Sequence, residues 1–108
     1  MTRARAERVA RRYLEEWTRR NGGAVLDLTA TREGRTHWLF AAAPVSDDIH
    51  HGGPQSVIVD KKTAETGTLG FWAMQAGFGI LTVDEVRRFL DPTQIHFLDA
   101  FLPPENED

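Results

Sequence analysis

A short polar segment near the middle of the chain concentrates side chains that could do chemistry. It places two carboxylates and two imidazoles within five positions, as Asp47, Asp48, His50 and His51. These residue types bind divalent metal ions, but adjacent histidines on an extended chain point in different directions, and no i, i+4 pair forms on a helix. We therefore expect no metal site here. The segment is either solvated or in contact, through its acidic part, with a basic surface of a partner protein.

Nucleophilic catalysis needs a nucleophile beside a general base. Ser46 and Ser56 can each be drawn beside a histidine, including His37 or His96, but neither serine stands in a nucleophile-elbow sequence. The chain has no cysteine, so it offers no thiolate nucleophile and no cysteine-ligated zinc. Its glycines do not follow a strand and open a helix in the GxGxxG or Walker manner. The sequence predicts a protein that is not an enzyme and binds no cofactor.

Charge is distributed unevenly along the 108-residue chain, whose net charge is −3. Residues 1–20 hold seven arginines and three glutamates, whereas residues 84–108 hold seven acids and two arginines. Glu15 and Glu16 stand four residues from arginines on both sides, so a helix here neutralises much of its own charge. No stretch approaches the ~18 apolar residues of a membrane span. We expect a cytoplasmic protein that binds neither nucleic acid nor membrane, with arginines that are solvated or contact a partner.

Hydrophobic spacing predicts the elements that position these residues. The first twenty residues form a long helix with one buried stripe, which ends at Asn21-Gly22-Gly23. The apolar positions of the stripe are Ala6, Val9, Ala10, Tyr13, Leu14 and Trp17. A strand follows, because apolar residues then alternate along the chain. The residues expected on its core face are Ala24, Leu26, Leu28 and Ala30.

Three further strands are predicted from short runs rich in β-branched and aromatic residues. These runs cover residues 37–42, 56–60 and 67–71. The first run is expected to be a central strand, with Trp38 and Leu39 on opposite faces of the sheet. An exposed polar loop joins it to the second run, and the third run returns as the hairpin partner of the second.

Residues 71–81 concentrate large apolar side chains without a regular period, and we expect a loop. Two interpretations stay open for this loop: burial under the last helices, or aromatic anchors at a partner surface. The candidate anchors are Trp72, Met74 and Phe78.

The C-terminal part is predicted to contain two short helices. Thr82 and Glu85 have the spacing of a capping box, which starts the first helix. Asp91 caps the second, with Pro92 at the first helical position, where its missing N–H is harmless. Residues 103–108 are expected to be a frayed acidic tail.

This order of elements predicts an α+β fold within one domain, residues 1–108. The long N-terminal helix packs on a four-stranded antiparallel sheet, followed by one or two short C-terminal helices. Because the strands carry apolar residues on both sides, the second face of the sheet also needs a cover. We expect the C-terminal helices or another protein to provide it, and a second copy of the chain, in a homodimer, is one such protein.

The stretch from residue 52 to residue 65 reads Gly-Gly-Pro-Gln-Ser-Val-Ile-Val-Asp-Lys-Lys-Thr-Ala-Glu and is followed by Leu-Gly at 69–70. It resembles the YrhB-like, immunity protein 35 family, which has a tryptophan-bearing strand, a glycine-proline entry into a strand ending in Val-Asp-Lys, a Thr-Gly-Glu-like turn and a closing Leu-Gly. Trp38 fits the tryptophan strand. The residues that match the turn motif are Gly53, Pro54, Asp60, Lys61, Glu65 and Gly70.

Asp60 is expected to accept hydrogen bonds from the backbone of the turn that follows it. It is not expected to act with Lys61 as an acid–base pair, because consecutive residues on a strand face opposite ways. The sequence departs from the family pattern at Ala64, where glycine is expected. Since alanine is disfavoured at positive φ, we expect the turn to differ or to be longer.

The resemblance implies an immunity protein, an antidote that binds a cognate bacterial toxin domain of a polymorphic toxin system and blocks it sterically. The toxin or effector is expected to be encoded by a neighbouring gene. The interface is expected to include the polar segment at residues 47–51, the loop carrying Trp72, Met74 and Phe78, and the acidic C-terminus. The alternative is a chaperone-like binding module that holds unfolded or secreted client proteins through apolar surface.

Overall fold

The computed structural model describes residues 1–22, 25–45 and 53–98. The chain begins with one long helix, α1 (Arg3–Asn21), which is capped by the hydroxyl of Thr2. Its expected buried stripe is confirmed at Ala6, Ala10 and Leu14. Among the described residues, no helix combines the length and the apolar character needed to cross a bilayer.

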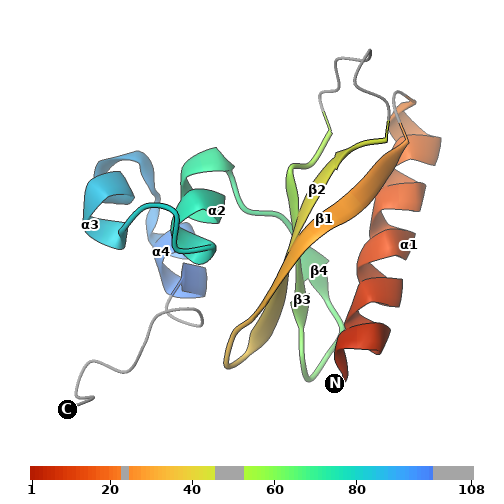
Figure 1. Cartoon of the computed structure of the whole chain (residues 1–108), viewed down its shortest axis with the longest axis horizontal. Helices are drawn as coiled ribbons and strands as arrows, with labels where there is room; N and C mark the ends of the chain where they lie inside the picture. Colours follow the sequence, from red (N-terminus) through yellow and green to blue (C-terminus); the bar gives the residue numbers. More distant parts are fainter. Residues whose placement is uncertain (23–24, 46–52, 99–108) are drawn as a thin grey trace.

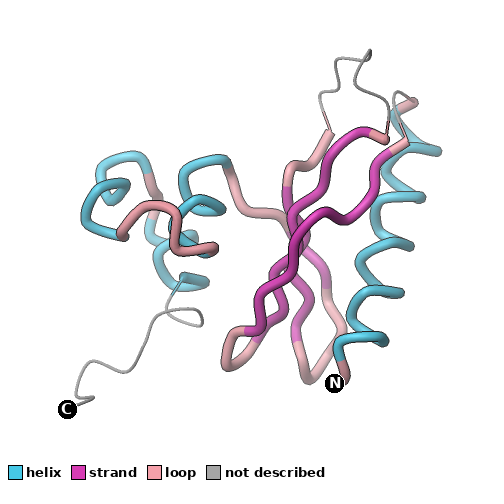
Figure 2. Tube along the Cα trace, in the orientation of Figure 1, coloured by secondary structure: helices cyan, strands magenta, loops and turns pink. Residues whose placement is uncertain are grey.

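Four strands form one antiparallel sheet in the order β1-β2-β3-β4. They are β1 (Leu26–Glu33), β2 (His37–Pro44), β3 (Ser56–Asp60) and β4 (Thr66–Gly67). Figure 1 shows α1 along one face of this sheet and the short C-terminal helices on the other side. Figure 2 shows the same arrangement, with the strands between the two groups of helices. The predicted α+β fold is confirmed.

Each face of the sheet has its own hydrophobic core, because β2 alternates as expected. Trp38 and Phe40 pack towards α1, together with Val57 and Val59 of β3. Leu39 packs on the opposite face with residues of the C-terminal helices. The buried members of that second core are Leu39, Ile58, Leu69, Ala73, Ala76, Val86 and Leu98. The C-terminal helices therefore supply a cover for the second face.

Two details of the expected strands are wrong. Ala30 is exposed rather than buried, because the β1–β2 register shifts between Leu28 and Ala30 and turns the rest of β1 relative to the core. The last strand ends at Gly67, not at Phe71. Beyond β4, the side chain of Ser56 takes the place of the backbone hydrogen bonds between strands. Its hydroxyl accepts a hydrogen bond from the Leu69 N–H and donates one to the Leu69 carbonyl, both at 2.9 Å.

The segment expected to be a loop after β4 forms a helix, α2 (Phe71–Gly77). The buried residues of α2 are Ala73, Ala76 and Gly77. Only small residues fit this face, because a Cβ on Gly77 would lie 2.7 Å from Cδ2 of the fully buried Leu39. A guanidinium nitrogen of Arg32 donates to the Gly77 carbonyl at 2.5 Å, which fixes the end of α2 on the sheet.

The remaining elements are α3 (Val83–Val86), the 3-10 helix η1 (Arg87–Phe89) and α4 (Pro92–Leu98). The expected capping box is present: the Glu85 N–H donates to the Thr82 hydroxyl, and the Thr82 N–H donates to the Glu85 carboxylate. The side chain of Asp91 accepts a hydrogen bond from the N–H of Gln94 at 2.9 Å, as expected for a cap. The acidic tail lies outside the described residues.

Candidate functional site

Three aromatic rings lie together on the surface of the C-terminal helices. We call Phe71, Trp72 and Phe89 the aromatic patch; their exposed fractions are 50%, 39% and 46%. The rings of Trp72 and Phe89 stack with centroids 4.6 Å apart, and Phe71 meets Trp72 edge-to-face at 5.0 Å. The guanidinium of Arg88 lies 4.9 Å from the centre of the Phe89 ring. The patch is therefore an ordered apolar surface with a cation beside it.

The exposure of the patch follows from how the short helices pack. Helix α2 turns its alanines and Gly77 to the sheet, so the large rings of Phe71 and Trp72 project from the outer side. The 3-10 turn η1 buries none of its residues and brings Phe89 against Trp72. Half-exposed rings retain apolar surface area that a partner can bury, and aromatic rings are typical anchors of protein interfaces.

The structure separates the three anchors expected in this segment. Trp72 belongs to the aromatic patch, whereas Met74 and Phe78 are half-buried and pack against the second core. Met74 and Phe78 thus lie on the buried side of the segment, whereas the role of Trp72 as an anchor at a partner surface stays a prediction. Sequence reasoning did not single out Phe71 and Phe89 as anchors. The signal for the helix was the i, i+3, i+4 spacing of the small residues at 73, 76 and 77, which form its buried face.

The four residues of the polar segment, Asp47, Asp48, His50 and His51, lie outside the described residues. Within the described ranges, no group of three or more histidine, aspartate or glutamate side chains is placed to hold a metal ion.

Asp60 anchors the turn that follows β3. Its carboxylate accepts hydrogen bonds from the backbone N–H groups of Lys62 at 2.7 Å and Thr63 at 3.0 Å. These two bonds are the main reason why the pKa of Asp60 is lowered, with smaller contributions from the charge of His37 and the Thr63 hydroxyl, while desolvation opposes them. Lys61 points elsewhere and pairs with Glu33 at 2.5 Å. Asp60 and Lys61 thus serve separate contacts, as the strand geometry predicted.

The turn differs from the expectation at Ala64. This residue has φ = +62° and is the sole non-glycine residue with positive φ among those described. Its N–H donates to the Asp60 carbonyl at 2.9 Å, and the Asp60 N–H donates to the Glu65 carbonyl at 2.9 Å, which closes the hairpin. The turn therefore places an alanine in the left-handed conformation, which favours glycine.

The remaining residues of the turn motif have packing roles. A Cβ on Gly53 would lie 3.0 Å from the Trp17 ring, so this glycine allows close contact with α1. Pro54 is half-buried before β3. Gly70 is the N-cap of α2, and a Cβ there would lie 3.1 Å from the side-chain nitrogen of Gln94.

A hollow of about 360 Å³ lies beside the turn and contains two histidines. Nε2 of His37 lies 3.5 Å from the Asp60 carboxylate, and Nδ1 lies 2.8 Å from the Thr36 hydroxyl. Burial lowers the pKa of His37 and the charge of His96 lowers it further, whereas the charge of Asp60 raises it. His37 also meets the Phe97 ring edge-on at 5.2 Å. Both nitrogens of His37 therefore have neighbours that hold the ring in place.

Comparisons with known proteins found nothing similar: no family model, no curated protein and no solved structure matches the chain.

Proposed function

We propose that this chain is an immunity protein, which binds a cognate bacterial toxin domain and blocks it sterically in the cytoplasm of the producing cell. The observation that carries the proposal is the aromatic patch, because stacked rings left half exposed are suited to bind a protein surface. The resemblance around the Asp60 turn directs the proposal to immunity proteins. Steric blocking requires a stable scaffold and a tight interface but no catalytic group.

The geometry of the patch supports tight binding. Phe71, Trp72 and Phe89 already contact one another, so little side-chain freedom is lost when a partner covers them. A stable interface covers roughly 800 Å² on each partner, and a few central aromatic anchors contribute most of its free energy. Arg88 borders the patch and can contact acidic groups at the rim of the partner.

Co-expression tests the proposal. The protein encoded immediately upstream is expressed alone and together with this chain, and cell survival and a one-to-one complex are scored. We expect the upstream protein to be toxic alone, the pair to be tolerated, and the two proteins to co-purify. A toxin unrelated to this gene pair is the control and should still kill. Toxicity that persists when both proteins are expressed would overturn the proposal.

The alternative is a chaperone-like module that uses the same aromatic patch to hold unfolded or secreted clients. Exposed aromatic surface favours it, because unfolded clients present apolar segments. An aggregation assay with unrelated substrates separates the two functions. A client-holding module suppresses aggregation at near-stoichiometric ratios, whereas an immunity protein leaves aggregation unchanged and binds one partner.

A further inference from the structure

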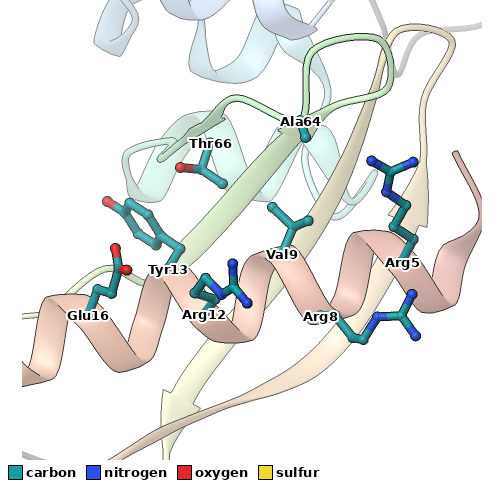
Figure 3. Close-up of a pocket in the computed structure, with 8 residues that line it drawn as sticks. All are labelled: Arg5, Arg8, Val9, Arg12, Tyr13, Glu16, Ala64 and Thr66. Atoms are coloured by element: carbon teal, nitrogen blue, oxygen red, sulfur yellow. The ribbon is translucent and has the colours of Figure 1, made fainter.

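A groove of about 520 Å³ lies between α1 and the turn that leads into β4. Helix α1 packs on the face of the sheet opposite the C-terminal helices, which carry the aromatic patch (Figure 1). Arg5, Arg8 and Arg12 line the groove from the helix, and we call these residues the arginine stripe. Tyr13 contributes its ring from the same helix, and Thr66 faces it from β4. Figure 3 shows these side chains, with Tyr13 projecting from α1 towards the strand that carries Thr66.

The arginine stripe differs from the other flank of α1 in how its charges are compensated. On the flank that faces β1, Arg11 pairs with Asp27, and Arg3 pairs with Glu7 at 3.0 Å. The three guanidinium groups of the stripe form no ion pair with the carboxylates of residues 1–22, 25–45 and 53–98. Three cations therefore line one concave surface without an acidic partner in the described part of the chain.

This arrangement conflicts with the electrostatics of the helix itself. The first turn of α1 contains no acidic residue, although the positive end of the helix dipole favours acids there. Arg5 and Arg8 are three residues apart, and Arg8 and Arg12 are four apart, so like charges are neighbours on the helix surface. A bound anion would relieve both conflicts. Local rules broken in this way are expected at functional sites.

We propose that this groove binds a small oxyanion ligand of the di- or triphosphate class. Guanidinium groups bind phosphate through paired hydrogen bonds, and hydroxyl groups such as those of Tyr13 and Thr66 can donate further ones. Arg5 and Arg12 are seven residues apart, about 10 Å along the helix axis, which exceeds one phosphate group and fits two or three in a row. The groove volume falls within the range of about 300–1,000 Å³ that is typical of small-molecule sites.

The surroundings of the groove favour a compact anion over a polymer. Glu16 lines the end of the groove beyond Arg12, so a carboxylate interrupts the basic surface after two turns of helix. The net charge of the chain is −3, which opposes long-range attraction of a nucleic acid or of a long acidic peptide. The proposal is independent of toxin binding, because the aromatic patch lies on different elements.

Isothermal titration calorimetry on the full chain tests the proposal, with pyrophosphate, inorganic tripolyphosphate and ATP as probes. We expect one-to-one binding that weakens as salt is added. Arg12→Gln should weaken binding about tenfold or more, because a charge-assisted pair is lost. Arg12→Lys keeps the charge but loses the paired hydrogen bonds of a guanidinium, so its affinity should lie between those of the unsubstituted protein and Arg12→Gln. Arg20→Gln is the matched control: it removes the same charge from an exposed position of α1 outside the groove.

The two sources of phosphate are distinguished by comparing probes of equal charge. If ATP binds more tightly than tripolyphosphate, the ligand is a nucleotide held partly by its base or ribose. Tyr13→Phe removes the hydroxyl that contacts phosphate, so it should weaken both probes alike. If the two probes bind equally, the groove recognises the phosphate chain alone. Either result supports the proposal.

Three results would overturn it. The first is the absence of saturable binding by all three probes, with the variants folded by circular dichroism. The second is an equal loss of affinity in Arg12→Gln and Arg20→Gln, which would show attraction to overall charge rather than to the groove. The third is tighter binding of a glutamate-rich peptide or of DNA than of any phosphate probe.

Discussion

The indole of Trp72 lies parallel to the ring of Phe89 within 17°, with ring centroids 4.6 Å apart. This stack joins α2 to η1, two short elements that do not form one continuous helix. The aromatic patch therefore exists only when the C-terminal helices are packed in their native arrangement, and its order depends on the second core beneath it.

Phe89→Ala should destabilise the C-terminal helices modestly and loosen Trp72. The lost aromatic contact is worth about 0.5–1.5 kcal/mol, with little cavity cost because the ring is half exposed. Urea unfolding measures the change in free energy, and near-ultraviolet circular dichroism reports the order of the indole. Ile80→Ala is the control, since Ile80 is 67% exposed and outside the patch. Equal effects of the two substitutions would contradict a structural role for the stack.

Gly77→Ala should lower the free energy of unfolding by about 1–2 kcal/mol. The added Cβ would lie 2.7 Å from Cδ2 of Leu39 in a fully packed core, and such overpacking usually costs about 1–3 kcal/mol. The higher helix propensity of alanine offsets part of this cost. The midpoint of urea denaturation measures the effect. An unchanged midpoint would show that α2 does not lie as close to β2 as described.

Ala64→Gly should stabilise the protein by about 0.5–1 kcal/mol. The left-handed conformation costs an L-residue roughly 1–2 kcal/mol, and glycine avoids this cost. The greater backbone entropy of glycine in the unfolded chain offsets part of the resulting stabilisation. For a chain of this size the melting temperature should rise by about 2–6 °C. Thermal unfolding followed by circular dichroism gives the value, with Gly79→Ala as the opposite control because Gly79 also has positive φ. A lower melting temperature for Ala64→Gly would refute the turn geometry.

Stability should increase as pH rises towards about 6.5 because of His37. Its pKa is lowered in the folded protein, so the unfolded chain binds more protons between the lowered pKa and the ordinary value of 6.5. The contribution of neutral His37 is fully present above about pH 6.5 and is lost as the pH falls through the lowered pKa. Urea midpoints measured across this range should show the slope.

His37→Gln should remove that slope, and His96→Gln should reduce it, because the charge of His96 is the smaller of the two causes that lower the pKa of His37. An unaltered slope in His37→Gln would show that another group titrates in this range.

Asp60 contributes a separate transition in acid. Its pKa is also lowered in the folded protein, so its contribution to stability is present above about pH 4 and is lost at lower pH.

Much of the fold was predictable because its signals are local. The stripe of Ala6, Ala10 and Leu14, the alternation of Trp38 and Leu39, and the capping box at Thr82 each depend on residues close in sequence. The anchoring role of Asp60 followed from the same kind of local chemistry.

The missed features depend on contacts between distant residues. Gly77 ordinarily breaks a helix, and only its approach to Leu39 of β2 explains why a glycine ends α2 there. The register shift that exposes Ala30 arises from pairing with β2, and the left-handed Ala64 is held by hydrogen bonds across the hairpin. The partnership of Trp72 with Phe89 likewise appears only when the C-terminal helices pack together.

The proposed function assigns recognition of the partner to the aromatic patch, and the affinity of the complex tests this assignment most directly. The dissociation constant for the proposed toxin, the protein encoded immediately upstream, is measured by calorimetry for the unsubstituted protein, Trp72→Ala and Ile80→Ala. Loss of a central aromatic anchor costs about 2 kcal/mol or more, so Trp72→Ala should bind about thirtyfold more weakly and protect cells poorly. Ile80→Ala should bind like the unsubstituted protein. Full affinity and full protection in Trp72→Ala would contradict the assignment.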